Sequence, residues 1–133
     1  MNLINDMPYT IPAQSLSRIY GSLIENGNKE KATQLIQEYL NNPGIYEASE
    51  RDFNRLGYQF LRLQKCENAL HVFNAATLIF PKSWNVFDSY AEALHQCDKK
   101  EAAVKMYQKS IELNPRNENG KQMLLKIEKE TGK

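Results

Sequence analysis

Two histidines and two cysteines have the most reactive side chains of this 133-residue chain. A hydrolase needs a nucleophile, a base and a group that orients the base, all within hydrogen-bond reach. His95 and Cys97 lie two positions apart in a segment with helical periodicity, and residues at that spacing do not face one another. His71 falls beside the packing surface of a predicted helix, which indicates a partly buried structural histidine. We therefore predict no catalytic residue and expect that the chain is not an enzyme.

The two cysteines, Cys66 and Cys97, match no CxxC or zinc-ligand spacing. Because two cysteines are too few for a disulfide framework, we interpret them as reduced thiols near helix ends. The sequence contains no HExxH, no GxSxG, no glycine-rich phosphate loop and no EF-hand spacing. We accordingly expect neither a cofactor nor a metal ion.

The charges of the chain nearly cancel, with 17 Lys and Arg against 16 Asp and Glu and a net charge of +1. Basic residues alternate with acidic ones and are not grouped with aromatic residues, so we expect neither nucleic acid nor an anionic membrane as a partner. The carboxylates Glu47, Glu50, Asp52, Asp88 and Glu92 are typical of solvated helix faces. No apolar run approaches the ~20 residues that a membrane-spanning helix requires.

An internal repeat predicts the elements that position these residues. Shifting the chain against itself by 34 residues pairs Phe53 with Phe87, Lys65 with Lys99, Glu67 with Glu101, Ala69 with Ala103 and Pro81 with Pro115. At 100° per residue, Phe53, Leu56, Gly57 and Phe60 form one helical stripe, and Gly57 lets a second helix approach closely. Each repeat is therefore a helical hairpin that must stack on its neighbours to bury its apolar faces.

The predicted organisation is a single domain over residues 1–133. It comprises an extended lead (1–11), a degenerate repeat (12–44), two clearer repeats (50–83 and 84–117) and a capping helix (118–131). In the degenerate repeat Ala32 lies 37 residues before Ala69, which indicates about three inserted residues around 41–44. Asn117 is the expected N-cap of the closing helix, because its side chain can accept a hydrogen bond from the first turn.

The pattern Phe53-x-x-Leu56-Gly57-x-x-Phe60, then Ala69-x-x-x-Phe73 and Pro81, resembles the tetratricopeptide repeat (TPR). Phe53 stands where this family usually has tryptophan, and the next copy departs further from the pattern. The resemblance implies an all-α, right-handed superhelix of antiparallel helical hairpins. It would contain about three repeats, a C-terminal capping helix and no strand.

In proteins of this family the first helix of each hairpin lines a concave groove that receives a partner segment. By resemblance, the groove here consists of Gln14, Ser17, Arg18, Arg51, Asn54, Arg55, Tyr58, Arg62, Asn85, Asp88, Ser89 and Glu92. One interpretation is that its arginines bind carboxylates of an acidic partner while Asn54 and Asn85 hold a peptide backbone. The alternative is that the arginines pair with Asp88 and Glu92.

Three functions remain open from the sequence. The first is a module that binds a protein or peptide in the groove, although the clamp for chaperone tails is not expected, since Ser17 and Gly21 replace its Lys and Asn. The second comes from residues 80–93 and 110–117, which are similar to the TPR region appended to some bacterial serine hydrolases of the β-lactamase-like and esterase types. This chain would then be a C-terminal accessory module linked covalently to a hydrolase domain. The third is weak self-association through the end faces of the stack.

Localisation follows from the choice between these functions. The chain is expected to be cytoplasmic by default, and periplasmic or otherwise extracytoplasmic if it is a fragment of an exported hydrolase.

Overall fold

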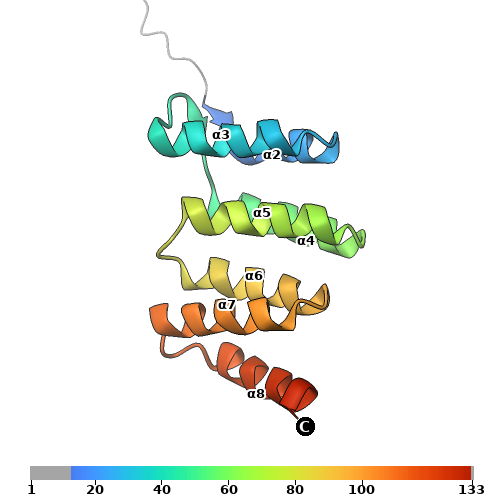
Figure 1. Cartoon of the computed structure of the whole chain (residues 1–133). Coiled ribbons are helices and arrows are strands. Elements are labelled where there is room, and N and C mark those ends of the chain that lie inside the picture. The colour runs from blue at the N-terminus through green and yellow to red at the C-terminus, as the bar shows by residue number, and fades with distance from the viewer. Residues whose placement is uncertain (1–12, 133) are drawn as a thin grey trace, which may run out of the picture.

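The computed structural model describes residues 13–132, which form seven helices stacked as antiparallel hairpins (Figure 1). The helices are α2 (Leu16–Glu25), α3 (Lys29–Asn41), α4 (Glu50–Arg62), α5 (Cys66–Ile79), α6 (Trp84–Gln96), α7 (Lys100–Leu113) and α8 (Glu118–Gly132). The all-α helical-repeat fold predicted from the sequence is confirmed, and Pro81 and Pro115 lie just beyond the ends of α5 and α7, as expected. The predicted lead over 1–11 lies outside the described residues.

Each first helix begins at a capping residue, and these caps recur at positions 15, 49, 83 and 117. The hydroxyls of Ser15, Ser49 and Ser83 each accept a hydrogen bond of 3.2 Å from the backbone amide three residues further on. Asn117 caps α8 in the same way, with Oδ1 3.0 Å from the Gly120 amide. Such a cap stabilises a helix by roughly 1 kcal/mol. The 34-residue period of the sequence is thus the period of the helix starts.

The first repeat keeps this period although its elements differ in length. Helix α2 has 10 residues, whereas α4 and α6 have 13 each. The connector between α3 and α4 covers residues 42–49 and is twice as long as the connectors over 80–83 and 114–117. The longer connector lies where the sequence predicted inserted residues, and it compensates for the shorter α2.

Two short parallel strands lie at the start of the stack, so the prediction of no strand is wrong. Strand β1 (Gln14–Ser15) pairs with β2 (Tyr46–Glu47), with Gln14 opposite Tyr46. The Gln14 amide also donates a 2.9 Å hydrogen bond to the Ile45 carbonyl. The long connector makes this pairing possible, because its extra residues run alongside the segment that precedes α2. The strands thereby tie together the starts of α2 and α4.

Small residues set the distance between the two helices of a hairpin. A Cβ atom added to Gly57 would lie 2.5 Å from Cζ of Phe73, closer than real Cβ contacts allow. Ala69 and Ala103, the matching small residues on α5 and α7, are fully buried. The core forms one cluster from α2 to α6 and a second, centred on Tyr107 and buried Ile127, that joins α6, α7 and α8.

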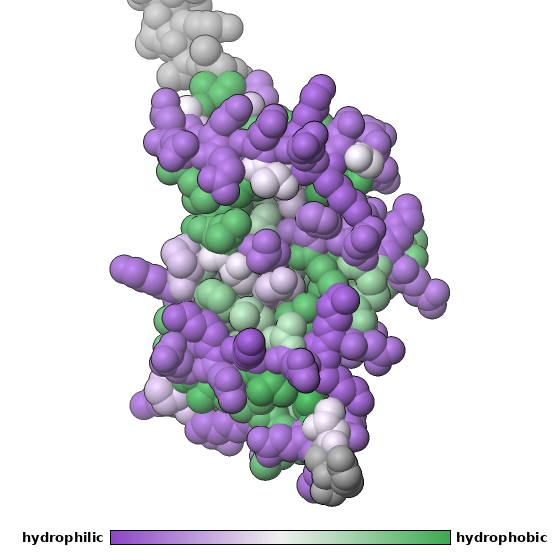
Figure 2. Space-filling model, viewed as in Figure 1, coloured by the Kyte–Doolittle hydropathy of each residue, from purple (hydrophilic) through white to green (hydrophobic). Residues whose placement is uncertain are grey.

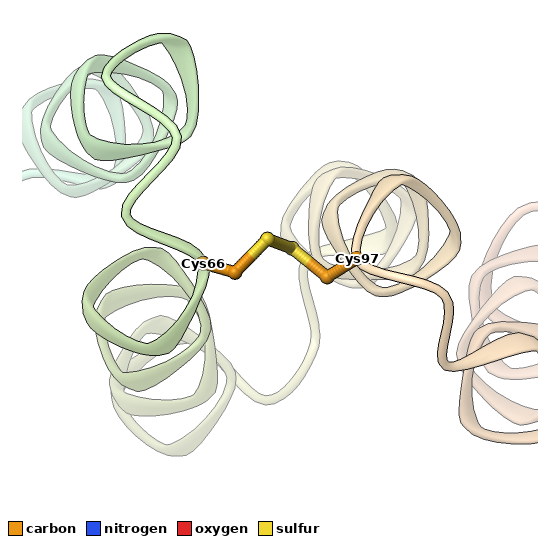
Figure 3. The surroundings of a disulfide bond; sticks show 2 residues. All are labelled: Cys66 and Cys97. Atoms are coloured by element: carbon orange, nitrogen blue, oxygen red, sulfur yellow. A yellow bond between two sulfur atoms is a disulfide. The ribbon is translucent and has the colours of Figure 1, made fainter.

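Cys66 and Cys97 form a disulfide, so the prediction of reduced thiols is wrong (Figure 3). Cys66 is the first residue of α5 and Cys97 is the C-cap of α6, and their Cα atoms lie 6.0 Å apart. The reason is the stacking of hairpins, which places the turn after α4 beside the turn after α6. In these two turns Gln64 and Asp98 have positive φ angles of 61° and 64°.

Hydrophobic residues show in bands between hydrophilic ones on the face turned toward the viewer (Figure 2). Such a mixture is normal for a folded protein, since there is too little polar surface to cover it completely. None of the described helices is both long enough and apolar enough to cross a membrane.

Candidate functional site

Helix α4 presents a row of polar side chains to a hollow that it shares with α6. This α4–α6 hollow has a volume of about 590 Å³ and is lined by Glu50, Arg51, Asn54, Arg55, Tyr58, Arg62 and Asn85. All of these except Glu50 belong to the predicted groove. The row exists because α4 buries Phe53, Gly57 and Phe60 on its other side, so the remaining stripe faces outward.

The α4–α6 hollow carries excess positive charge, with three arginines and one glutamate among its lining residues. Arg55 has Asp52 of the same helix 3.8 Å away, and both side chains are exposed. Exposed pairs of this kind contribute at most about 1 kcal/mol. Among residues 13–132, neither Arg51 nor Arg62 takes part in an ion pair. None of the ion pairs among the described residues joins these arginines to Asp88 or Glu92.

The acids of α6 are bound by other groups. Tyr58 donates a 2.6 Å hydrogen bond to Glu92, and burial together with this bond raises the pKa of the Tyr58 hydroxyl. Asp88 accepts a 2.9 Å hydrogen bond from Asn117, and burial raises the pKa of its carboxyl although this bond opposes the shift. Ser89 is buried. These three predicted groove residues of α6 are consequently not among those that line the hollow.

Asn54 lies on the wall of the α4–α6 hollow with its side-chain oxygen buried. Within the part of the chain that the structure describes, this oxygen has no hydrogen-bond partner. An unsatisfied buried polar group costs about 1 to 3 kcal/mol, and most such groups in folded proteins are satisfied.

A second hollow lies on the other flank of α4, against α2. This α2–α4 hollow has a volume of about 310 Å³ and is lined by Ser17, Arg18, Gly21, Ser22, Glu25, Leu56, Gln59, Phe60 and Leu63. It contains the predicted groove residues Ser17 and Arg18, although Ser17 is itself buried and its hydroxyl lies 3.0 Å from that of Ser15. The apolar part of the lining was not predicted. In the sequence, only Leu63 indicates this apolar lining, because it continues the apolar stripe of α4 beyond Phe60.

Gln14 is separated from the other predicted groove residues. It lies in β1 and lines a smaller hollow with Ala13, Ser15, Arg18 and Ile19. The structure thus divides the predicted groove into hollows on the two flanks of α4 and a separate one at the start of the stack.

The histidines do not form a nucleophile–base pair. His95 Nε2 lies 2.9 Å from Glu130, which joins α6 to α8, and the neighbouring Cys97 is in the disulfide. The His71 carbonyl accepts a 2.9 Å hydrogen bond from Tyr20, and burial lowers the pKa of the His71 ring. No group of three His, Cys, Asp or Glu side chains in the described residues is arranged to hold a metal ion.

Comparisons with known proteins define the class of this fold. No family model matches the sequence, and no curated protein matches it. A MamA R50E mutant superimposes with a TM-score of 0.66 at 16% identity, over 88% of this chain and 83% of the other. The first TPR of Spaghetti (RPAP3), bound to the HSP90 peptide SRMEEVD, gives 0.60 at 19% identity, over 89% and 91%. MamA from Desulfovibrio magneticus gives 0.58 at 19% identity, over 88% and 64%.

These identities show the fold alone, and the fold is TPR-like. None of the three descriptions refers to a serine hydrolase, so the accessory role beside a hydrolase domain stays a prediction from the sequence resemblance.

Proposed function

We propose that this chain is a non-catalytic protein-interaction module that binds an acidic partner segment along the concave face of α4 and α6. The observation that carries this proposal is the row of arginines on α4, of which Arg51 and Arg62 have no acidic partner among the described residues. A helix that exposes several cations without neutralising them is suited to a ligand that brings carboxylates.

The lining of the α4–α6 hollow fits such a ligand chemically. Guanidinium groups are planar, permanently charged and able to bind a carboxylate through two parallel hydrogen bonds. The amides of Asn54 and Asn85 lie in the same hollow and can bond with the backbone of an extended segment. The similar TPR of Spaghetti is bound to a peptide, SRMEEVD, with three acidic side chains, which supports a peptide as the kind of ligand.

The test replaces Arg51, Arg55 and Arg62 together by Ala and measures capture of partners from a lysate of the source organism. The matched control replaces three exposed lysines outside the hollow, Lys31, Lys105 and Lys126, by Ala, so that the net charge changes equally. Both variants should melt close to the parent, because exposed charges contribute little to stability.

We expect the arginine variant to lose partners that the parent and the lysine variant retain, and we expect capture to weaken as salt is raised. The salt effect follows because exposed charges are screened beyond about 8 to 10 Å at ordinary ionic strength. Equal recovery of the same partners by all three proteins would show that the arginine row is only a solvated surface. As a check on the non-catalytic part of the proposal, none of the three should hydrolyse activated esters or β-lactams above the buffer rate.

A further inference from the structure

Helix α4 is a ridge between two hollows of different chemistry. Arg55 and Gln59 are one helical turn apart, yet Arg55 lines the basic α4–α6 hollow and Gln59 lines the α2–α4 hollow. On the α2 side the lining includes partly buried Leu56 and Leu63, which is 59% exposed, above the buried ring of Phe60. A ligand that crosses α4 therefore meets arginines on one flank and apolar side chains on the other.

The α2–α4 hollow is open because α2 contributes small side chains to it. Ser17, Gly21 and Ser22 line that side, and Gly21 packs so closely on Leu56 that an added Cβ would lie 2.9 Å from Leu56 Cδ2. The charged residues at its edge are one cation, Arg18, and one anion, Glu25, so the hollow as a whole neither attracts nor repels charge. Its dominant property is exposed apolar surface, which is favourable to cover with another apolar group.

We propose that the partner segment combines acidic residues with one large apolar side chain, which enters the α2–α4 hollow while the carboxylates lie on the arginines across α4. This inference rests on the proposed function and names the second feature of the same ligand. A helix with its side chains is about 10 to 12 Å across, and an extended chain advances roughly 3.3 Å per residue. The apolar residue should thus lie about three positions from the nearest carboxylate.

Four synthetic peptides test this spacing by NMR titration of the isotopically labelled full chain. Two carry the leucine in opposite chain directions, EEEGGL and LGGEEE, and two carry serine in its place, EEEGGS and SGGEEE, all with blocked ends. One leucine peptide should bind about three- to tenfold more tightly than its serine counterpart, since partial burial of a leucine contributes that much. Its shifts should include the amides of α2 and the end of α4.

Two variants with matched exposure separate the hollow from a general apolar effect. Leu63→Ser should abolish the preference for leucine while leaving the affinity for the serine peptides unchanged. Leu125→Ser changes a leucine that is 54% exposed on α8, outside the α2–α4 hollow, and should alter neither affinity. Loss of the leucine preference in both variants, or in neither, would overturn the assignment of the apolar subsite.

The outcomes also separate this inference from the proposed function. Equal binding of leucine and serine peptides by the parent, with loss of both in the arginine variant, would overturn the apolar subsite and leave the acidic partner supported. Binding that persists in the arginine variant, or no binding of any peptide at millimolar concentration, would overturn the acidic partner and this inference with it.

The disulfide carries a second, independent inference. We propose that this chain matures in an oxidising compartment outside the cytoplasm, in place of the default expectation from sequence. The chain has two cysteines and both take part in this disulfide, so the folded chain has no free thiol. Disulfides form and persist in oxidising compartments and are rare in the cytosol, where thiols are kept reduced.

The test uses cell fractions of the source organism, an antibody against the chain and a maleimide that adds a large mass to each free thiol in denaturant. We expect the chain in the extracytoplasmic fraction, with its mass unchanged until a reductant is added and then increased by two labels. Labelling of both thiols without reductant, or recovery of the oxidised chain from the cytoplasmic fraction, would overturn this inference.

Discussion

Removal of the disulfide between Cys66 and Cys97 should lower the free energy of unfolding by about 3 to 4 kcal/mol. The bond closes a loop between residues 31 positions apart. In the chain-entropy model, closing a loop of that length removes about 12 cal/mol/K from the unfolded ensemble, or roughly 3.7 kcal/mol at 25 °C. Both cysteines are only half-buried, so replacing their side chains should add little to this cost.

The corresponding change in melting temperature is large enough to measure easily. Unfolding entropy near 60 °C is about 2.1 cal/mol/K per residue, which for this chain gives roughly 280 cal/mol/K. A loss of about 3.7 kcal/mol should thus lower the melting temperature by about 13 °C. Helicity well below the transition should stay the same, because neither cysteine belongs to the two core clusters.

The assay is thermal unfolding followed by circular dichroism and calorimetry, on the parent with and without reductant and on the Cys66→Ser/Cys97→Ser variant. Reduced parent and double variant should melt together, and reductant should not affect the double variant. If the parent melted at the same temperature with and without reductant, although its thiols were shown to be oxidised before treatment, the loop-closure reasoning would be refuted. The unfolded chain would then already hold the two turns close together.

Three further changes test the packing, the turns and the site. Gly57→Ala should destabilise the fold by about 1 to 3 kcal/mol in denaturant unfolding, because the new Cβ would meet Phe73, and an unchanged midpoint would contradict the hairpin packing. Gln64→Gly should stabilise it by about 0.5 to 1 kcal/mol in the same assay, since glycine adopts a positive φ without steric cost, and a loss of stability would contradict this. The raised pKa of Asp88 means that between pH 3.8 and that pKa the folded state binds more protons than the unfolded state, so stability should fall as pH rises. Asp88→Asn, which keeps an acceptor for Asn117, should remove this fall from melting curves collected between pH 3 and 7.

The helices could be predicted from the sequence because the signals that define them are local. The capping residues Ser49 and Ser83 and the small residue Gly57 act within one hairpin, and a 34-residue shift aligns them with their counterparts. The disulfide could not be predicted, because Cys66 and Cys97 meet only when successive hairpins stack. The strand pair likewise depends on a contact between two connectors that carry no strong strand pattern.

The site shows the same division between local and non-local information. The arginine row follows from the 100° periodicity of a single helix and could be listed in advance. The partners of Asp88 and Glu92 could not, because Asn117 lies 29 residues beyond Asp88 and Tyr58 lies 34 residues before Glu92. The apolar hollow was missed for a related reason, since it arises where small residues of α2 meet larger ones of α4.

The residue that caps α8 also affects the charges near the α4–α6 hollow. Asn117 caps α8 with its oxygen, and its amide nitrogen donates to Asp88 and, at 2.8 Å, to Ser110. Ser110 in turn donates a 2.8 Å hydrogen bond to the Trp84 carbonyl at the start of α6. Through this network Asn117 binds the carboxylate of Asp88 at the start of α8. Tyr58 binds the carboxylate of Glu92. Tyr58 of α4 and Asn117 at the start of α8 thus bind the two acids of α6, and the described ion pairs do not join these acids to the arginines of α4.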